Sequence, residues 1–524
     1  MWSFFTKKKK PRASPEKYLQ ARYDAAQTTS ENIKHWAMAD GLSANASMSA
    51  DVRRTLRNRS RYEVANNSYA KGMILTMAGD CVGTGPRLQL QTNDSKNNRQ
   101  VELDFELWAE KVDLAAKLRA MRMAKATDGE AFALLVNNPK LDHEVKLDIR
   151  LIEAERVTTP NILVHQQTPA TNGSGLPQRS GSSNRGAASS RCIDGIEFDQ
   201  YGNVTNYYVL KNHPGDVSFK LENYERVPAD AMIHWFRQDR PEQHRGVPEI
   251  TPALPLFAQL RRYTLAVLAA AETAADFAAV IYTDAPANGE AMPLDPMDVI
   301  PLTKRMATVL ADGWKLGQIK AEQPATSYPE FKREILGEIG RCLQIPINIV
   351  TGDSSRHNYA SGRLDHQTYF KALKIEQDHL ALAVMDRLFD AWFREYELLN
   401  NQSQYLHKAP ATNGSGLMAT GRLSQLWCSV LRCWMWDGQE HVDPAKEANA
   451  QGTRLVNLTT NLATEYARQG KDWEIELRQI AKERALMQQL NLSPIDNAKP
   501  EKPPDDKTDD EEDVNNNDNI TEGR

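Results

Sequence analysis

Three short runs of this 524-residue sequence hold residue types that could do chemistry. Gly83-Thr84-Gly85 could belong to a phosphate-binding loop, but it lacks the lysine and the helix start that such a loop needs. Asp128-Gly129-Glu130 could offer a pair of carboxylates, and His441-Val442-Asp443 could offer metal ligands. Because no second cluster accompanies them, we expect the first two runs to be turns. We expect the third to lead into a helix that starts at Pro444, with Asp443 as its N-cap.

Known catalytic patterns are missing elsewhere as well. The sequence has no G-x-x-x-x-G-K-[ST], H-E-x-x-H or G-x-S-x-G run, so nothing assembles a nucleophile, a base and an oxyanion site. We therefore predict that the protein is not an enzyme, with no catalytic residue, no metal and no cofactor. The five cysteines are odd in number and irregular in spacing, which predicts buried or partly buried thiols in a reducing cytoplasm. They are Cys81, Cys192, Cys342, Cys428 and Cys433.

Charge is distributed unevenly along the chain. The net charge is −5, but residues 499–524 carry ten acidic and four basic side chains, so the remainder is close to +1. The start is basic, with Lys7, Lys8, Lys9, Lys10 and Arg12. This pattern differs from the broad basic surface of a protein that grips nucleic acid tightly. A nearly neutral body would suit a protein that lets DNA slide past.

Length and hydropathy indicate several folded domains away from a membrane. Apolar residues make up 41% and charged residues 25%, and 524 residues are too many for one hydrophobic core. The apolar run at residues 1–5 is too short for the core of a secretory signal. The most apolar stretch, Thr264–Tyr282, is interrupted by Glu272 and Asp276. We expect it to be a buried helix that does not span a membrane.

Periodicity predicts a mixed first half and a helical second half. The first 240 residues combine a helical stretch from Ser49 and a helix at 101–124 with strands. Those strands are expected at 88–91, 131–137, 147–152, 195–198, 204–210 and 231–236. Later helices are expected at 251–279, 328–343, 363–397 and 445–489. Two segments rich in small and polar residues, 168–190 and 493 onward, are expected to be a mobile loop and a disordered tail.

Several short segments are each weak evidence alone, but their order along the chain is specific. They are Leu56-Arg57-Asn58-Arg59-Ser60-Arg61, Asn66-Asn67-Ser68-Tyr69-Ala70-Lys71-Gly72, Cys81-Val82-Gly83-Thr84-Gly85, Asp128-Gly129-Glu130, Ile152-Glu153-Ala154-Glu155-Arg156-Val157, Asp194-Gly195-Ile196-Glu197-Phe198-Asp199, His213-Pro214-Gly215, Ile233-His234-Trp235-Phe236, Arg240-Pro241-Glu242-Gln243-His244-Arg245-Gly246-Val247-Pro248, Asn358-Tyr359-Ala360-Ser361-Gly362-Arg363, His441-Val442-Asp443-Pro444 and Gly470-Lys471-Asp472-Trp473-Glu474. Together, from about residue 15 to 490, they resemble the lambda-like family of phage portal proteins. Ala360 and Gly362 depart slightly from the family's usual Asn-Tyr-Ser-Ser-Ala-Arg.

The resemblance implies a multi-domain α+β portal fold that assembles into a ring, usually of twelve subunits. It implies the following order along the chain: a basic and polar arm (1–29), a mixed wing (30–248, with the flexible loop 168–190), a stem helix (249–282), a small α/β clip (283–327), a second stem helix (328–350), a channel loop (351–362), a long helix (363–397), a return to the wing (398–442), crown helices (443–492) and the acidic tail (493–524).

Two groups of residues become site candidates through this resemblance. The loop between the second stem helix and the long helix would face DNA in the channel, through Ser354, Ser355, Arg356, His357 and Asn358; the alternative is a solvated surface loop. Contacts between subunits are expected from Arg53, Arg57, Arg61, Arg261, Arg262, Ala270 and Ala274. For the first three, contact with DNA is the alternative, and for the alanine-rich helix the alternative is a core helix within one subunit.

The implied function is a channel for DNA at one vertex of a capsid, through which the genome is packaged and ejected. The expected partners are other copies of the chain, double-stranded DNA without sequence specificity, the terminase large subunit, major capsid and scaffold proteins, and head–tail connector proteins, but no membrane. The expected location is the virion, after assembly in the host bacterial cytoplasm, where the ring would nucleate the head. The alternatives are a packaging-associated nuclease or ATPase and a monomeric DNA-binding adaptor.

Overall fold

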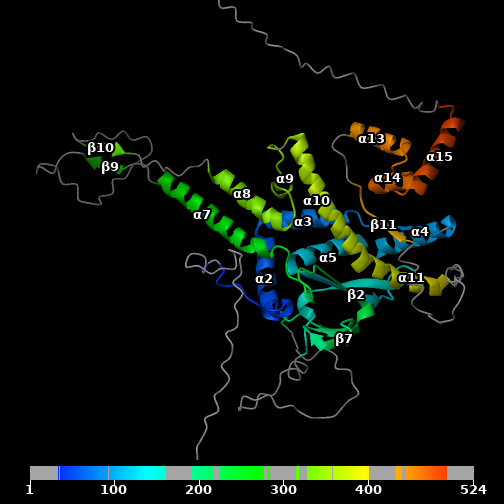
Figure 1. Cartoon of the computed structure of the whole chain (residues 1–524), viewed down its shortest axis with the longest axis horizontal. Coiled ribbons are helices and arrows are strands. Elements are labelled where there is room, and N and C mark those ends of the chain that lie inside the picture. The colour runs from blue at the N-terminus through cyan, green and yellow to red at the C-terminus, as the bar shows by residue number, and fades with distance from the viewer. Residues whose placement is uncertain are drawn as a thin grey trace, which may run out of the picture. The chain divides into compact units, whose positions relative to one another are not determined.

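The computed structural model describes residues 34, 36–92, 94–160, 191–217, 224–276, 280–283, 314–317, 327–356, 358–400, 432–438 and 444–492 (Figure 1). The expectations for the arm, the loop 168–190, most of the clip segment, residues 401–431, His441–Asp443 and the tail lie outside these residues. The chain forms two compact units. The first comprises Met1–Leu75, Met121–Leu134 and Arg150–Tyr369, and the second comprises Thr76–Ala120, Leu135–Ile149 and Phe370–Arg524.

Helices dominate the described part of the chain. They are α1 (Ala44–Ser47), α2 (Ala50–Asn66), α3 (Ser68–Val82), α4 (Ser95–Lys111), α5 (Leu114–Asp128), α7 (Leu254–Asp276), α8 (Ser327–Cys342), α9 (Ile347–Thr351), α10 (Tyr359–Leu380), α11 (Asp386–Asn400), α13 (Pro444–Val456), α14 (Leu462–Arg468) and α15 (Trp473–Gln489). Three short 3₁₀ turns are η2 (Ala154–Arg156), η3 (Ala229–Ala231) and η4 (Thr251–Ala253). A π-helical turn, η5 (Ala381–Met385), joins α10 to α11.

The strands in the described ranges form four small sheets. They are β1 (Arg87–Leu90), β2 (Glu130–Asn137), β3 (Leu147–Ile152), β4 (Arg191–Ile193), β5 (Ile196–Phe198), β6 (Val204–Leu210), β7 (Tyr224–Pro228), β8 (Met232–Phe236), β9 (Val280–Thr283), β10 (Trp314–Gly317) and β11 (Arg432–Met435). The sheet orders are β3-β2-β8, β4-β5-β6-β7, β9-β10 and β1-β11. The expected mixture of helix and sheet is confirmed.

In the first unit, β8 pairs antiparallel with the start of β2, so that Glu130 lies opposite Phe236 and Ala133 opposite Ile233. The strands expected at 195–198 and 204–210 are confirmed as β5 and β6, which pair antiparallel as a hairpin around residues 200–202. The stretch that precedes α7 and the start of α7 are well packed, since Ala253 and Phe257 are fully buried. Helix α8 packs against α7, and the rings of Tyr263 and Phe331 lie 4.5 Å apart.

In the second unit, an aromatic cluster forms the core. Phe105 and Trp108 of α4 meet Phe389 and Trp392 of α11, with the Phe105 and Trp392 ring centroids 5.1 Å apart and perpendicular. Trp434 of β11 closes the cluster against Phe105 at 5.7 Å. The π-helical turn contributes as well, because Val384 and Met385 within it are buried.

Helix boundaries follow from local capping. Asp472 accepts hydrogen bonds from the backbone N–H of Glu474 and Ile475 at 2.8 and 3.1 Å, which fixes the start of α15. The helix expected at 101–124 is in fact two helices. Asp113 has a φ of 51°, in the left-handed region, and this residue ends α4 before α5 begins.

The expectation of a buried helix at 264–282 is wrong in two respects, since α7 ends at Asp276 with residues 280–282 in β9, and one side of α7 is exposed. The side chains of Leu265 and Leu268 on α7 are 59% and 54% exposed. Among the described residues, no helix is long and apolar enough to cross a membrane. The thiols expected to be at least partly buried are so at Cys81, Cys192 and Cys342, but Cys433 is exposed. Cys428 lies outside the described residues.

The chain passes between its two units inside regular elements instead of in linkers. The boundaries Leu75/Thr76 and Ala120/Met121 fall within α3 and α5. Those at Leu134/Leu135 and Ile149/Arg150 fall within β2 and β3, and Tyr369/Phe370 falls within α10. Each unit is therefore built from three separate stretches of sequence.

Candidate functional site

The loop expected to face DNA lies between α9 and α10. Gly352 ends α9 with a φ of 66°, a conformation that glycine adopts without steric cost. Helix α10 begins at Tyr359, three residues before the expected end of the loop. Ser354, Ser355 and Arg356 are exposed, while His357 lies outside the described residues.

Asn358 has a structural role that was not predicted. Its side-chain oxygen accepts a hydrogen bond from Ser361 N at 2.8 Å, and its own N–H donates to Ser361 Oγ at 3.2 Å. This reciprocal arrangement caps α10. The loop also holds an acid, Asp353, which accepts a hydrogen bond from Ser355 N at 2.9 Å. The described part of the loop therefore contains one acidic residue, Asp353, and one basic residue, Arg356.

Helix α7 holds four of the residues expected to pack between subunits. Arg261 pairs with Glu63 of α2 in the same chain, with 2.6 Å between Nη2 and Oε2, and it lies over the Tyr62 ring at 5.3 Å. Arg262 is exposed and Ala270 is half-buried. Ala274 lies in the last turn of α7, and its side chain is not among those described.

One side of α7 beyond Arg261 is not covered by any of the residues that the structure describes. Arg262, Leu265, Leu268 and Glu272 follow one another at helical spacings of three or four residues, and all four are exposed. Thr264, on another side, is held by a 3.1 Å hydrogen bond with Tyr328 of α8. Helix α8 thus covers one side of α7. On the exposed side, Leu265 and Leu268 form an apolar pair that lies between Arg262 and Glu272.

The three arginines of α2 that were expected to pack between subunits, Arg53, Arg57 and Arg61, find carboxylates within their own chain. Arg53 forms an ion pair with Asp194, and Arg61 holds Asp128 through two hydrogen bonds of 2.7 and 2.9 Å. Arg53 is buried, and burial lowers the pKa of its guanidinium to about 9, with the nearby Arg245 charge adding to the effect. A role of these arginines between subunits stays a prediction.

The third arginine joins a buried hub at Glu130, the first residue of β2. Arg57 Nη2 donates to Glu130 Oε1 at 2.8 Å, and His234 Nε2 lies 3.2 Å from Oε2. Arg245 donates from Nη2 to Oε1 at 2.7 Å and from Nε to both oxygens, Oε2 at 2.9 Å and Oε1 at 3.1 Å. The backbone N–H of Gly246 adds a further bond at 3.1 Å. Sequence reasoning missed this hub, although its members lie in the quoted runs 56–61, 128–130, 233–236 and 240–248.

The hub keeps its carboxylate ionised. Burial alone would raise the pKa of Glu130, but Arg245, the hydrogen bond with His234 and Arg57 together hold it well below its usual value. The remaining donors of Arg245 reach backbone oxygens of Val157 and Ala154 at 3.0 and 3.1 Å. One guanidinium thus connects β2 with the first residue of η2 and with the residue that follows this turn.

Two glycines permit the close approach of these segments. Gly129 has a φ of 92°, and a Cβ there would overlap the backbone of Val247. A Cβ on Gly246 would overlap the carbonyl of Gly129. The run 128–130 is thus a turn before a strand, as expected, and it is also the place where the loop 245–248 docks.

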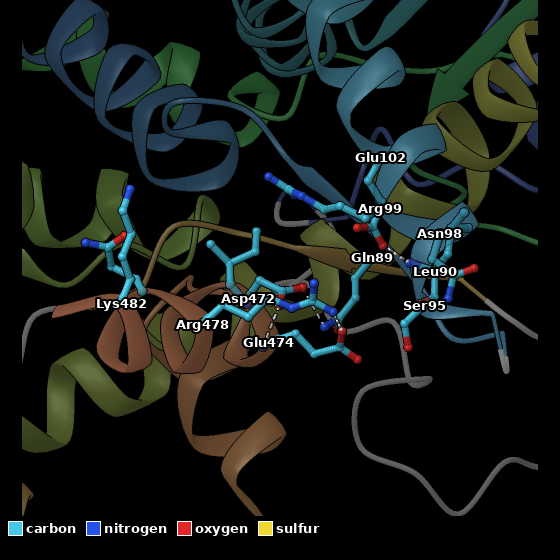
Figure 2. Close-up of a pocket in the computed structure, with 12 residues that line it drawn as sticks. Gln89, Leu90, Ser95, Asn98, Arg99, Glu102, Asp472, Glu474, Arg478 and Lys482 are labelled. Carbon is cyan, nitrogen blue, oxygen red and sulfur yellow. Dashed lines mark hydrogen bonds and ion pairs between the residues drawn. The ribbon is translucent and has the colours of Figure 1, made fainter. Parts of the chain in front are cut away.

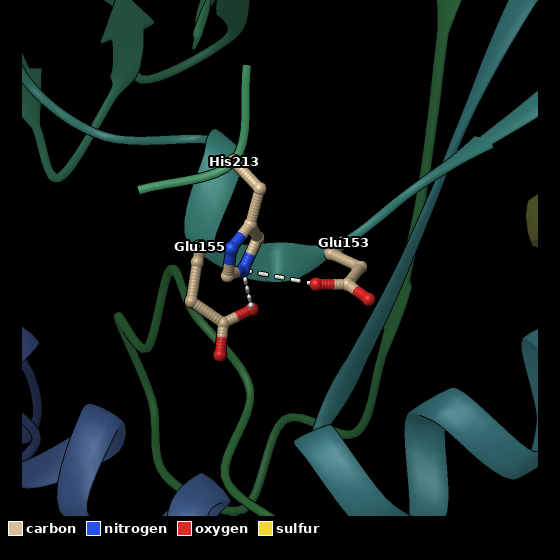
Figure 3. Close-up of side chains that lie close together, drawn as sticks. All are labelled: Glu153, Glu155 and His213. Carbon is tan, nitrogen blue, oxygen red and sulfur yellow. Dashed lines mark ion pairs between the residues drawn. The ribbon is translucent and has the colours of Figure 1, made fainter. Parts of the chain in front are cut away.

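Glu153, Glu155 and His213 form the one group among the described residues that could hold a metal by proximity (Figure 3). The ring of His213 argues against this. Its Nδ1 accepts a hydrogen bond from Gly215 N at 3.0 Å, so in the neutral ring Nε2 carries the proton and lies 2.9 Å from Glu153. Glu155 is taken up by Arg61, at 3.0 Å. A metal would have to displace that proton and compete with the guanidinium, so the residues do not fit a metal site.

The second unit contains a small polar cavity of about 300 Å³ between β1, α4 and α15 (Figure 2). Gln89 Nε2 donates to Asp472 Oδ2 at 2.8 Å, and Leu90 N donates to Glu102 Oε1 at 2.7 Å. Burial raises the pKa of Glu102 to about 7, and the charges of Asp472 and Glu474 add to the rise. The cavity has no nucleophile beside a base, so this geometry supports no catalytic step.

Comparison with known proteins gives consistent results. The family model described as phage portal protein, lambda family, matches residues 29–377, which is more than half of the chain. The chain is 22% identical over 465 residues to a probable portal protein of Halomonas phage phiHAP-1, covering 84% of this chain and 81% of that one.

Among solved structures, the neck of a native gene transfer agent particle with C12 symmetry gives a TM-score of 0.40 at 14% identity, covering 69% of this chain and 86% of that chain. The neck of the empty particle with C6 symmetry gives 0.42 at 12% identity, covering 70% and 92%. The extent of the family match decides the assignment: the chain belongs to the lambda family of phage portal proteins.

Proposed function

We propose that this protein forms a ring, usually of twelve copies, around a DNA channel at one vertex of a capsid. The ring would serve as the conduit for genome packaging and ejection and would nucleate the head. It would act without catalysis, in the virion, after assembly in the host bacterial cytoplasm. Membership of the portal family supports this function, and the open side of α7 is the observation that carries it in the structure.

The open side of α7 has the properties of a surface that another subunit covers. Leu265 and Leu268 are more than half exposed, and burying the rest of each would contribute about 1 kcal/mol per side chain. Arg262 and Glu272 flank the pair with opposite charges. In a closed ring, every subunit uses the same two surfaces, so a modest contribution is repeated at each contact.

The proposed map assigns α7 and α8 to the stem, the segment 283–327 to the clip and α13–α15 to the crown. The wing would hold the sheets of residues 30–248. The terminase large subunit, capsid and scaffold proteins, and head–tail connector proteins would dock on this ring. DNA would pass through the channel without being read, because neither a basic surface nor a base-reading motif is visible in the sequence.

The loop 352–358 is the proposed channel element. Arg356 is exposed, and Asp353 lies in the same loop. A ring of such loops, with acidic and basic residues in balance, would release few counterions when DNA binds. It would therefore bind DNA loosely, which suits the passage of DNA more than its retention. Movement of the DNA would then come from a separate ATPase.

The test is the mass and the image of the purified full-length protein at micromolar concentration and physiological salt. A ring with a central channel is expected for the wild type. Leu265→Glu with Leu268→Glu should reduce the fraction in rings, and Ala270→Glu should act in the same direction. Tyr201→Glu, at the exposed tip of the β5–β6 hairpin, is the matched control and should leave rings intact. A monomeric wild type would contradict the proposal, and ATP hydrolysis by the purified protein would favour a packaging enzyme.

A further inference from the structure

A closed ring requires two different surfaces on each copy, one that covers the next copy and one that the previous copy covers. The open side of α7 supplies one of them in the proposed function. The outer face of α8, formed by Glu330, Glu334, Glu338 and Arg341, has the chemistry of the other. All four side chains are exposed, and among the residues that the structure describes no hydrogen bond or ion pair is recorded for any of these side chains.

The acidic residues of this face are unfavourable in the isolated chain, because like charges four residues apart on a helix repel each other. Arg341 offsets the last of them, since it follows Glu338 by three residues. Arg333 follows Glu330 at the same spacing, but it lies near Asp353 in the loop after α9. A cation from outside the chain would therefore relieve the repulsion chiefly at the first two glutamates.

The remaining base of α8, Lys332, is directed into its own chain. Its Nζ lies 5.1 Å from the ring centroid of Tyr69 and 6.0 Å from that of Tyr328. Aromatic ring faces attract a cation, so this ammonium group does not compensate the acids of the outer face.

Helices α7 and α8 lie side by side, and the two surfaces lie on opposite flanks of this pair (Figure 1). Thr264 and Tyr328 mark the sides that face each other, through their 3.1 Å hydrogen bond. At 3.6 residues per turn, Arg262 lies about 160° around α7 from Thr264. Glu330 lies about 160° around α8 from Tyr328, and Glu334 about 120°. Each copy thus presents a basic and apolar flank on one side and an acidic flank on the other, as a head-to-tail contact requires.

The heights of the two surfaces also agree. The helices run antiparallel, because the ring of Phe331 near the start of α8 lies 4.5 Å from that of Tyr263, while Cys342 at the other end contacts the backbone of Ala253 just before α7. Rotation about an axis along the two helices leaves the height of every residue unchanged. Residues that are level within one copy are therefore level across a contact between copies.

Glu330 lies at the level of Arg262, because each of them precedes a member of this ring contact. With a rise of 1.5 Å per residue, Glu334 lies about 6 Å and Glu338 about 12 Å nearer the start of α7. The acid of the open side, Glu272, lies about 15 Å from Arg262 in the other direction, past the start of α8. Arg262 is thus the charge of the open side that stands level with the acidic face.

We infer that, in the ring, the outer face of α8 of one copy covers the open side of α7 of the next, so that Arg262 lies between Glu330 and Glu334 of the partner subunit. Phe331 of the partner subunit, which is 44% exposed in the isolated chain, then meets Leu265. This contact rests on the proposed ring and supplies the second of its two surfaces.

The test is charge reversal in the full-length protein, read by mass photometry at the concentration at which half of the wild type is in rings. Arg262→Glu should lower the fraction in rings at least fivefold, and so should Glu330→Arg combined with Glu334→Arg. The chain with all three changes should recover at least half of the wild-type fraction, because every contact is again complementary. Glu338→Arg is the matched control and should leave the fraction unchanged. All these residues are exposed, so circular dichroism should be unaltered.

Mixing provides the second measurement. The Arg262→Glu protein and the protein with Glu330→Arg and Glu334→Arg should each assemble poorly alone but form rings when mixed in equal amounts. Alternating copies then place a glutamate against an arginine at every contact. Such rings contain an even number of copies, and recovery between two chains cannot arise from a change within one of them.

A wild type without rings would contradict the proposed function itself. With wild-type rings present, the inference alone fails if Arg262→Glu assembles normally, or if neither the triple change nor the mixture recovers rings. An equal loss with Glu338→Arg would show a general effect of charge on assembly. Recovery of the Arg262→Glu protein by Glu272→Arg, with no effect of the α8 changes, would indicate a twofold contact between two α7 helices instead.

Discussion

Arg245 and Glu130 form a bidentate pair, with bonds of 2.7 and 2.9 Å, and their side chains are only 3% and 0% exposed. The pair links a loop to the first residue of a strand 115 residues earlier in the chain. A buried pair of this kind is costly to form but far more costly to break, because removal of one charge leaves the other without compensation in a dry site.

The first prediction concerns this pair. Glu130→Gln keeps the shape of the side chain but leaves Arg245 and Arg57 facing a neutral group, so we expect the free energy of unfolding to fall by about 3–5 kcal/mol. Chemical denaturation measures this change. Glu153→Gln is the control, since Glu153 is 60% exposed and its loss should cost less than about 1 kcal/mol. Equal effects of the two substitutions would contradict the hub.

The second prediction separates DNA contact from helix capping in the proposed channel loop. Arg356→Ala should change the amount of DNA packaged or retained while rings form normally. Asn358→Ala should instead lower stability by about 1 kcal/mol, because α10 loses its cap, whereas Asn358→Ser should keep it. Packaging assays and thermal melts measure the two effects. Normal, stable filled heads with Arg356→Ala and His357→Ala combined would remove the loop from the DNA path.

The third prediction is a pH dependence at Glu102. The folded protein holds this proton up to about pH 7, above the usual value of 4.5, so the contribution of Glu102 to stability is fully present below about pH 4.5 and is lost as pH rises through about 7. Glu102→Gln should therefore raise the Tm at about pH 8 and change it little at about pH 5. The side chain is only partly buried, so the gain should be on the order of 1 kcal/mol.

The control for Glu102 is the same substitution at exposed Glu144, which should leave the Tm within about a degree at both pH values. Differential scanning fluorimetry across the pH range is sufficient, since the difference between variants cancels the titration of other groups. A Glu102→Gln protein that is less stable than wild type at pH 8 would show that the ionised carboxylate is favoured in the fold.

The fourth prediction concerns the cluster of Glu153, Glu155 and His213. Because His213 Nδ1 accepts a hydrogen bond from Gly215 N, the proton of the neutral ring is on Nε2, 2.9 Å from Glu153, and dialysis against EDTA or addition of Zn²⁺ should leave the Tm unchanged within about a degree. Elemental analysis of the purified protein gives an independent check. A metal that copurifies in a stoichiometric amount and disappears in His213→Gln would contradict this prediction.

Much of the local structure could be predicted from the sequence, because it depends on local patterns. The alternation over 147–152 predicted a strand with the bounds that the structure shows, and the alanine-rich run after residue 250 predicted a long helix. The division at Asp113 was not predictable in this way. An aspartate with a positive φ carries no sequence signal comparable to glycine or proline.

The same distinction between local patterns and tertiary contacts applies to the candidate site residues. Arg53, Arg57 and Arg61 were recognised as a cluster, but their partners depend on tertiary pairing across 67 to 141 residues, which no local pattern encodes. The apolar character of α7 was recognised as well. Whether Leu265 and Leu268 are covered by their own chain cannot be deduced from hydropathy, because a subunit contact and a core have the same composition.

The passage of the chain between its two units inside α3, α5, β2, β3 and α10 has a consequence for how such a gene can change. A single recombination breakpoint between residues 76 and 369 gives each unit one part of its sequence from one parent and the rest from the other parent. Exchange between diverged relatives would therefore separate co-adapted partners, such as Arg57 and Glu130 or Phe105 and Trp392. We expect inherited crossovers in this gene to be concentrated outside that interval, so that the body of the protein is transmitted as one block.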